Sequence, residues 1–206
     1  MIDLAHRKAR IIAIITNSVS LYPDLGVKNR HILIVGIINF IWNNWNEFWK
    51  NYWLCYLIGG VDVNRKRVIA LRPNLSRDEA LSLLCEANLY LRLNNTPSKI
   101  IKYFKLPTWG GDKEISNIAL AFGVDSPFNP SILSHYSQVL KDFRLARNTL
   151  IHMTRESVGD LKTILSRYRI QNPFSPNNFF DSFEIEYNKR CINYLTDLLI
   201  GLLSNI

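Results

Sequence analysis

Five side chains that can interact with a phosphate group gather in one short stretch late in the sequence. They are Arg144, Arg147, Asn148, His152 and Arg155. Arginine presents a planar fork of N–H donors to phosphate oxygens, asparagine adds a neutral donor and acceptor, and histidine exchanges protons near neutral pH. On a helix, these five groups would lie within about three turns. The stretch therefore predicts the binding or chemistry of phosphate.

Arg147 stands out because the pattern around it is apolar. The helix that carries it is predicted to begin at Asn129-Pro130, since proline fits a first helical turn, and to end near Gly159-Asp160. One face is apolar, through Val139, Leu140, Phe143, Ala146, Leu150 and Met153. Arg147 projects towards the edge of this face. Burying an unpaired guanidinium is costly, so we expect it to meet a carboxylate, a phosphate or a wet subunit interface.

The spacing of Arg147 and His152 constrains how they could act together. Five positions apart on an ideal helix, the two side chains point about 140° away from each other. Either the helix loosens between Thr149 and His152, or two chains meet across a two-fold axis and combine their groups. A third interpretation is structural: an arginine that bonds a neighbouring helix, followed by a histidine at the helix end.

Hydrophobic periodicity predicts that helices build the rest of the chain. The further helices are expected at Asp3–Leu21, Asn29–Tyr56, Ser76–Leu93, after Thr96-Pro97, Asp112–Gly123, Asp160–Tyr168 and Phe179–Leu203. Ser76 and Glu79 have the spacing of a capping box, and Asp112 is expected to cap the helix that it begins. Residues 61–72 read equally as a short hairpin or as a loop. We therefore predict an all-α bundle in a single domain, residues 1–206. Its core would be residues 1–58 and 130–206, with an inserted helical or loop region at residues 59–129.

The helix expected at Asn29–Tyr56 is unusually rich in aromatic residues. Its second half places Ile41, Trp42, Trp45, Phe48, Trp49, Tyr52, Trp53, Cys55 and Tyr56 on one arc and polar residues on the other, with only Phe40 out of place. Such a face could stack nucleic-acid bases, but packing against other helices in the core is the stronger interpretation.

Composition indicates an acidic partner. The chain of 206 residues carries a net charge of +8, and 48% of its residues are hydrophobic, which is enough for a full core. Excess lysine and arginine favours nucleic acid, because binding to phosphates releases condensed counterions. The run Arg65-Lys66-Arg67 is predicted to be a solvated loop that could also hold an RNA backbone.

Several other site types are not predicted. Cys55, Cys85 and Cys191 are odd in number and far apart, which favours free thiols in a reducing, cytoplasmic compartment. His6, His31 and His135 lack partners at metal-ligand spacing, so we expect neither a metal ion nor a cofactor. The start of the chain lacks the order of a signal peptide, and the most apolar run falls short of the ~20 residues of a membrane span.

The motif region resembles the HEPN superfamily. Arg147-Asn148 followed by His152 is similar to the arginine-polar-x-x-x-histidine motif that this superfamily carries near the end of a long helix in a helical bundle. The aromatic segment Trp42–Phe48 resembles the first core helix of several HEPN groups, and the residues flanking the motif read like that family. The resemblance covers the second helix and everything from Pro130 onward.

This resemblance implies a metal-independent endoribonuclease that works as a homodimer, with one motif from each chain in a shared cleft. His152 would exchange protons with the ribose 2′-hydroxyl or the leaving 5′-oxygen, Arg147 would stabilise transition-state charge, and Asn148 would orient the histidine or a phosphate oxygen. Arg144 and Arg155 would bind RNA. Products would be 2′,3′-cyclic phosphate ends, and DNA would be inert.

The resemblance also implies a biological setting. Many HEPN proteins are toxins or phage-defence effectors, which predicts an antitoxin or another regulatory protein as a partner. Some HEPN toxins carry a modifiable tyrosine two residues after the histidine, where this chain has Thr154. Two alternatives stay open: a non-catalytic HEPN-like module that binds RNA, nucleotide or protein, and a helical subunit whose aromatic face is an obligate protein interface.

Overall fold

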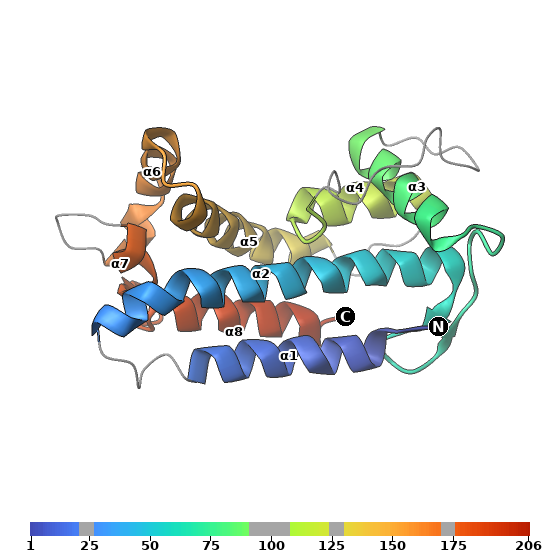
Figure 1. Ribbon diagram of the computed structural model, residues 1–206, viewed down its shortest axis with the longest axis horizontal. Helices are drawn as coiled ribbons and strands as arrows, with labels where there is room; N and C mark the ends of the chain where they lie inside the picture. Colours follow the sequence, from blue (N-terminus) through green and yellow to red (C-terminus); the bar gives the residue numbers. More distant parts are fainter. Residues whose placement is uncertain (21–26, 91–107, 124–129, 170–175) are drawn as a thin grey trace. The chain divides into compact units, whose positions relative to one another are not determined.

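The computed structural model describes residues 1–20, 27–90, 108–123, 130–169 and 176–206, and these residues are mainly helical. Eight α-helices lie within them (Figure 1): α1 (Leu4–Ser20), α2 (Val27–Ile58), α3 (Arg77–Tyr90), α4 (Asp112–Phe122), α5 (Pro130–Ile151), α6 (Arg155–Lys162), α7 (Pro176–Asp181) and α8 (Cys191–Ser204). The prediction of an all-α protein is confirmed at this level. The helix expected after Thr96-Pro97 falls outside the described residues.

Strands are short and few in the described part of the chain. Two-residue strands β1 (Ile2–Asp3), β2 (Gly60–Val61) and β3 (Arg67–Val68) form one sheet, in which β1 and β2 are parallel and β2 and β3 antiparallel. The second sheet pairs β4 (Tyr168–Arg169) with β5 (Phe183–Glu184). The 3-10 turn η2 (Leu165–Arg167) precedes β4. Of the two interpretations of residues 61–72, the hairpin is correct, and Arg65 takes a left-handed φ of 62° in its turn.

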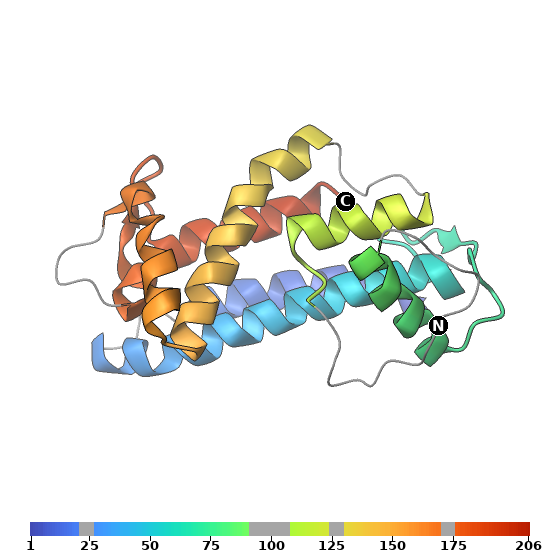
Figure 2. The same ribbon diagram turned by 90° about the horizontal axis from the view of Figure 1, so that it is seen from above.

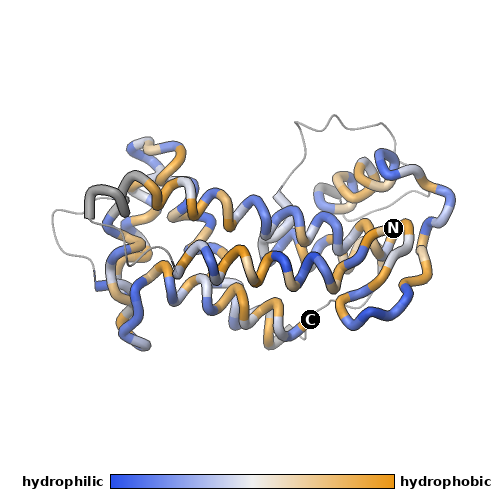
Figure 3. Tube along the Cα trace, turned by 60° about the horizontal axis from the view of Figure 1, so that its bottom comes forward, coloured by the Kyte–Doolittle hydropathy of each residue, from blue (hydrophilic) through white to orange (hydrophobic). Residues whose placement is uncertain are grey.

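The chain divides into two compact units. The first contains Met1–Ile11, Asn44–Ser134 and Ile206, and the second contains Ile12–Asn43 and His135–Asn205. The helices α1 and α2 therefore contribute one half to each unit. The predicted single domain with an insert at residues 59–129 stays a prediction. Hydrophobic and hydrophilic residues alternate along the helices, as amphipathic packing requires (Figure 3).

The aromatic face of α2 forms the core of the first unit. Trp45, Trp49 and Trp53 are fully buried, and the rings of Trp45 and Trp49 meet edge to face with their centroids 5.8 Å apart. This burial confirms the core interpretation and removes both the base-stacking surface and the exposed interface that the aromatic residues could have formed. Phe40, the one aromatic predicted to lie off this face, is 51% exposed.

The segment before α4 is fixed onto this aromatic core. The Trp45 indole donates a hydrogen bond to the Gly110 carbonyl at 2.8 Å, and the Asn46 side-chain oxygen accepts from the Trp109 backbone N–H at 2.7 Å. Gly110 lies so close that a Cβ built on it would be 2.2 Å from the Trp45 ring. Glycine is therefore required here for close packing.

Helix starts were mostly predictable from capping chemistry. The predicted capping box before α3 is present, because the Glu79 carboxylate accepts from the Ser76 backbone N–H at 2.8 Å. The prediction that Asp112 caps α4 is wrong, since Gly111 is the N-cap and Asp112 is the first helical residue. At the other end of α4, Gly123 adopts the left-handed conformation typical of a helix end.

In the second unit, α5 packs against α2 (Figure 2). The rings of Trp42 and Phe143 stack with their centroids 5.7 Å apart, and Phe143 meets Phe180 of α7 edge to face. Phe143 and Ala146 are fully buried. The apolar face predicted for the motif helix therefore does point into the core.

Three predicted helices in this unit have wrong boundaries. The one expected at Asp160–Tyr168 is α6, which runs from Arg155 to Lys162. The motif helix ends at Ile151 rather than near Gly159, because Thr154 takes an extended conformation and caps a new helix, α6, that runs through Gly159. The last helix begins at Cys191 rather than Phe179. Phe183 belongs instead to strand β5, where it pairs with Arg169 of β4.

The helices that the structure describes include none with the length and apolar character of a membrane span.

Candidate functional site

Arg147 lies where the C-terminal part of α5 meets α2. Its neighbours Phe143, Ala146 and Leu150 are buried in the core, which fixes the rotation of α5 about its axis. Arg147 itself is only half-buried, at the edge of this face as the sequence predicted. The helix thereby holds the guanidinium at the boundary between the core and the solvent.

The Arg147 guanidinium is held by two amide oxygens. Its Nε and Nη2 both donate to the side-chain oxygen of Asn39 on α2, at 3.2 and 2.7 Å. Its Nη1 donates to the side-chain oxygen of Asn148 at 3.0 Å. Three hydrogen bonds from three nitrogens leave the side chain little rotational freedom, so the group is positioned in advance.

The charge of Arg147 is not neutralised. Among the residues that the structure describes, no carboxylate forms an ion pair with it, and its partners are neutral amides. Burial lowers the pKa of the Arg147 guanidinium below its ordinary value, but arginine stays protonated in proteins. We expected a carboxylate, a phosphate or a wet subunit interface, whereas the partners that the structure shows are neutral amides. One of them is on the neighbouring helix α2, as the structural interpretation of the motif predicts.

Asn148 connects the two ends of the predicted motif. Its side-chain oxygen accepts from Arg147, and its backbone oxygen accepts from the His152 backbone N–H at 2.8 Å. The helical hydrogen-bond pattern therefore continues to His152, although α5 ends at Ile151. Within the described residues, the amide nitrogen of Asn148 makes no hydrogen bond, so it remains a potential donor.

His152 is exposed in the turn between α5 and α6. Its backbone oxygen accepts from the Ser157 hydroxyl at 3.0 Å, and the Thr154 and Ser157 side chains cap α6 directly behind it. Within the described part of the chain, no hydrogen bond reaches the His152 ring. The turn is thus fixed through its backbone while the imidazole stays accessible to solvent.

A buried threonine ties this turn to the motif helix. The Thr149 hydroxyl lies within 2.9 Å of the Leu145 carbonyl, one turn back on α5, and within 2.9 Å of the Ser157 carbonyl on α6. Thr149 is fully buried. It therefore links α6 to α5 and fixes the position of the turn that carries His152.

The five predicted site residues are only partly brought together. Arg147 and Asn148 are hydrogen-bonded, but no hydrogen bond joins His152 to either side chain in the described part of the chain. Arg144 and Arg155 are both exposed, on α5 and at the first position of α6. Met153, predicted to continue the apolar face, is 57% exposed because α5 has already ended.

Asn39 was missed as a site residue. The sequence places it on the polar arc of α2, where it interrupts a run of isoleucine and other apolar residues. That interruption is the signal that could have identified it, since a half-buried amide in an apolar stretch needs a hydrogen-bonding partner. The residue it contacts could not be inferred, because Asn39 and Arg147 are 108 positions apart.

Among the described residues, no group of three or more histidine, cysteine, aspartate or glutamate side chains could hold a metal ion. All three cysteines are buried and none is in a disulfide, and burial raises the pKa of the Cys55 and Cys85 thiols to about 11.

Comparisons of this chain with protein-family models, with curated proteins and with solved structures find no match.

Proposed function

We propose that this chain is a metal-independent endoribonuclease of the HEPN type. The observation that carries the proposal is the state of Arg147: its guanidinium is held by Asn39 and Asn148, keeps its charge, and lies on the same helix end as an exposed histidine. The resemblance of Arg147, Asn148 and His152 to the HEPN motif supplies the rest of the argument.

A phosphate group is the ligand that best fits Arg147. Amide oxygens satisfy N–H donors without cancelling the positive charge, so the charge remains available to an anion. Arginine binds phosphate oxygens through a planar fork, and it is more weakly hydrated than lysine. The net charge of +8 would attract RNA to the same molecule through longer-range forces.

His152 would carry the protons. In the proposed step, the 2′-oxygen of a ribose attacks the adjacent phosphorus and the bond from phosphorus to the 5′-oxygen breaks. One histidine removes the proton of the 2′-hydroxyl, and an imidazolium donates a proton to the leaving 5′-oxygen. The products are a 2′,3′-cyclic phosphate and a 5′-hydroxyl, and Arg147 stabilises the charge that develops on the phosphate oxygens.

This scheme needs two proton carriers, which a homodimer supplies with one His152 from each chain. RNA and a second copy of the chain are therefore the proposed partners. A toxin or phage-defence role in the cytoplasm, restrained by an antitoxin or other regulatory protein, completes the proposal by resemblance. Residue 154 is a threonine whose hydroxyl caps α6, not a tyrosine. The proposal therefore does not include regulation through a modified tyrosine at this position.

A second function, RNA binding without cleavage, has its own support. A general base needs a fixed orientation, and within the described residues no hydrogen bond orients the His152 ring. Arg147, Arg144 and Arg155 would bind RNA phosphates whether or not His152 takes part in chemistry.

Cleavage of structured RNA in excess EDTA separates these functions. Wild-type protein should cleave, His152→Ala should lower the rate by about 100-fold or more, and Arg147→Ala by a similar factor. End analysis should find cyclic phosphates. His135→Ala is the matched control, because His135 is an exposed histidine on the same helix, and it should cleave like the wild type.

Three outcomes are decisive. Cleavage that both variants lose and the control keeps supports the endoribonuclease. RNA binding that Arg147→Ala weakens, with no cleavage by any form, contradicts the enzyme and supports the binding module. Cleavage that survives in His152→Ala, or that EDTA abolishes, contradicts the proposed chemistry.

A further inference from the structure

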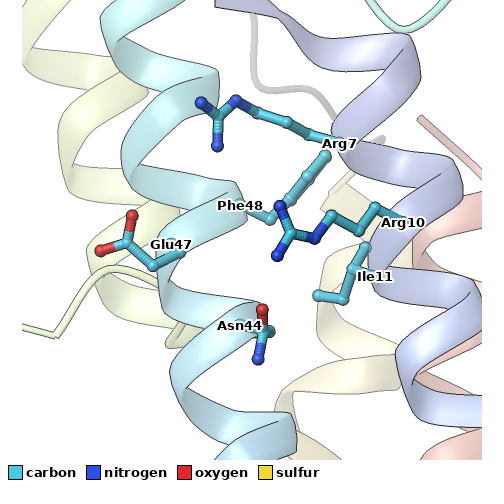
Figure 4. Close-up of a pocket in the computed structure, with 6 residues that line it drawn as sticks. All are labelled: Arg7, Arg10, Ile11, Asn44, Glu47 and Phe48. Carbon is cyan, nitrogen blue, oxygen red and sulfur yellow. The ribbon is translucent and has the colours of Figure 1, made fainter.

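A small pocket lies in the first unit, between the beginning of α1 and the middle of α2 (Figure 4). Its volume is about 220 Å³, and it is lined by Arg7, Arg10 and Ile11 of α1 and by Asn44, Glu47 and Phe48 of α2. All six residues belong to the first unit, so the pocket is part of one compact body. None of them is among the residues of the site proposed above.

Two arginines dominate this pocket. Arg7 and Arg10 are three positions apart on α1, which puts them on one face of the helix, and both guanidinium groups extend from α1 towards α2 (Figure 4). Two like charges at this spacing repel each other unless something compensates them. Across the described part of the chain, neither guanidinium has a hydrogen bond or an ion pair.

The one carboxylate at the pocket is already engaged. Glu47 forms an ion pair with Lys50, and the Asn51 side-chain amide lies 3.5 Å from its other carboxylate oxygen. In Figure 4 the Glu47 carboxylate points away from the Arg10 guanidinium. Lys50 therefore compensates the charge of Glu47, and the two arginines leave the pocket positive.

The wall behind the arginines is apolar. Ile11 and Phe48 are both buried, with 2% of their surface exposed. A low-dielectric wall strengthens the attraction between the guanidinium groups and an anion, because it replaces water that would screen them. The two charges would therefore act on an anion more strongly than a pair on an open surface.

The size of the pocket restricts its ligand. Pockets for drug-sized molecules measure about 300 to 1,000 Å³, so 220 Å³ is too small for a whole nucleotide. A phosphate group fits this combination of small volume, two planar donor forks and uncompensated positive charge. Any sugar or base attached to the phosphate would stay outside.

We propose that the pocket between α1 and α2 binds a phosphate group through Arg7 and Arg10. This inference goes beyond the proposed ribonuclease and does not depend on it, since it involves neither Arg147 nor His152. The phosphate has two potential sources: a small molecule, such as inorganic phosphate or a mononucleotide, and the backbone or 5′-end of RNA.

Nuclear magnetic resonance of the full-length protein tests the proposal directly. The side-chain Nε–Hε signals of Arg7 and Arg10 would be followed while inorganic phosphate, AMP or a 5′-phosphorylated 2′-O-methyl RNA is added at constant ionic strength. The methylated RNA has no free 2′-hydroxyl and cannot be cleaved by the proposed chemistry. At least one probe should shift both signals saturably, and the tightest probe identifies the source.

Charge-matched variants separate this site from general electrostatic attraction. The double variant Arg7→Gln/Arg10→Gln should weaken the binding of the best probe at least tenfold. Lys113→Gln/Lys162→Gln removes the same charge from two exposed residues, one on α4 and one on α6, and should change the affinity less than twofold. Both variants should unfold at the same denaturant concentration as the wild type, which shows that they fold.

Two results would overturn the proposed phosphate site. The proposal is wrong if no probe shifts the Arg7 and Arg10 signals saturably. It is also wrong if the two double variants lose affinity equally, because the binding would then reflect net charge alone. Failure of RNA cleavage in the assay described above would leave this test unaffected.

Discussion

Two charged groups on the same helix have partners of opposite kinds, one charged and one neutral. Asp142 and Arg147 are both on α5 and both lie against its packed face. Asp142 is buried and is fully paired: Arg167 donates two hydrogen bonds to it, at 3.1 and 2.8 Å, and Tyr168 and Gln138 donate one each. Arg147 is also held by side-chain hydrogen bonds, but its partners are neutral amides only.

This difference distinguishes a structural charge from an available one. The Asp142 carboxylate meets an opposite charge, so its network connects α5 to the segment after α6 and offers nothing to a ligand. The Arg147 charge is positioned but not cancelled. Proteins that place a charge in this way can use it on an anion, because little reorganisation is needed when the anion binds.

The largest effect on stability should come from removing the Asp142 carboxylate. Asp142→Ala leaves the Tyr168 hydroxyl buried without its acceptor and Arg167 without its ion pair, so the free energy of unfolding should fall by about 3 kcal/mol. Urea denaturation measures the loss. As a control, Asp197→Ala removes an exposed ion pair with Lys189 and should lower the free energy of unfolding far less. Equal losses in both variants would contradict the structural role of Asp142.

A smaller effect is expected at the junction between the two helices. Thr149→Val keeps the shape of the side chain but removes the hydroxyl that lies between the Leu145 and Ser157 carbonyls, and it should cost about 1 kcal/mol. Amide hydrogen exchange in residues 152–158 should rise more than in the first half of α5. Uniform exchange throughout α5 and α6 would show that Thr149 does not position the His152 turn.

The smallest effect concerns alkaline pH. Burial, followed by the charge of Asp142, raises the pKa of the Tyr168 hydroxyl above its ordinary value. The folded protein therefore keeps this proton where the unfolded chain loses it, so stability should decline as pH rises through about 10, the ordinary value for tyrosine. Urea denaturation of wild type and Tyr168→Phe over this range measures it. If the wild type and Tyr168→Phe show the same pH dependence of stability, Tyr168 does not cause the loss of stability at alkaline pH.

The sequence predicted the regular parts of this fold well. The extents of α1 and α2, the capping box of α3 and the start of α5 at Pro130 follow from periodicity and local hydrogen bonding, which involve neighbouring residues only. The end of α5 was misplaced because Gly159 is a weaker signal than the pair Thr154 and Ser157, whose reciprocal hydrogen bonds begin α6.

The site was predictable only in part. Arg147 was expected at the edge of an apolar face, and it lies there. Its partner on α2 is a long-range contact that no local pattern specifies, and so is the pairing of Asp142 with Arg167, 25 residues further along the chain. Periodicity predicts which charged residues lie next to the core, and the cost of burial requires that they have partners. The identity of the partner decides whether the charge is neutralised within the fold or can still attract a ligand.

The most direct test gives the Arg147 guanidinium a carboxylate partner, so that its charge is neutralised within the fold. Asn39→Asp would place a carboxylate where Arg147 now meets an amide oxygen, as Asp142 does for Arg167. Asn43→Asp is the matched control, because Asn43 is exposed one turn further along α2 and adds the same charge. Binding of a fluorescent 2′-O-methyl RNA should weaken at least tenfold in Asn39→Asp and less than threefold in Asn43→Asp, with folding intact in both. If Asn39→Asp binds RNA like the wild type, or no more weakly than Asn43→Asp, the charge of Arg147 does not serve RNA.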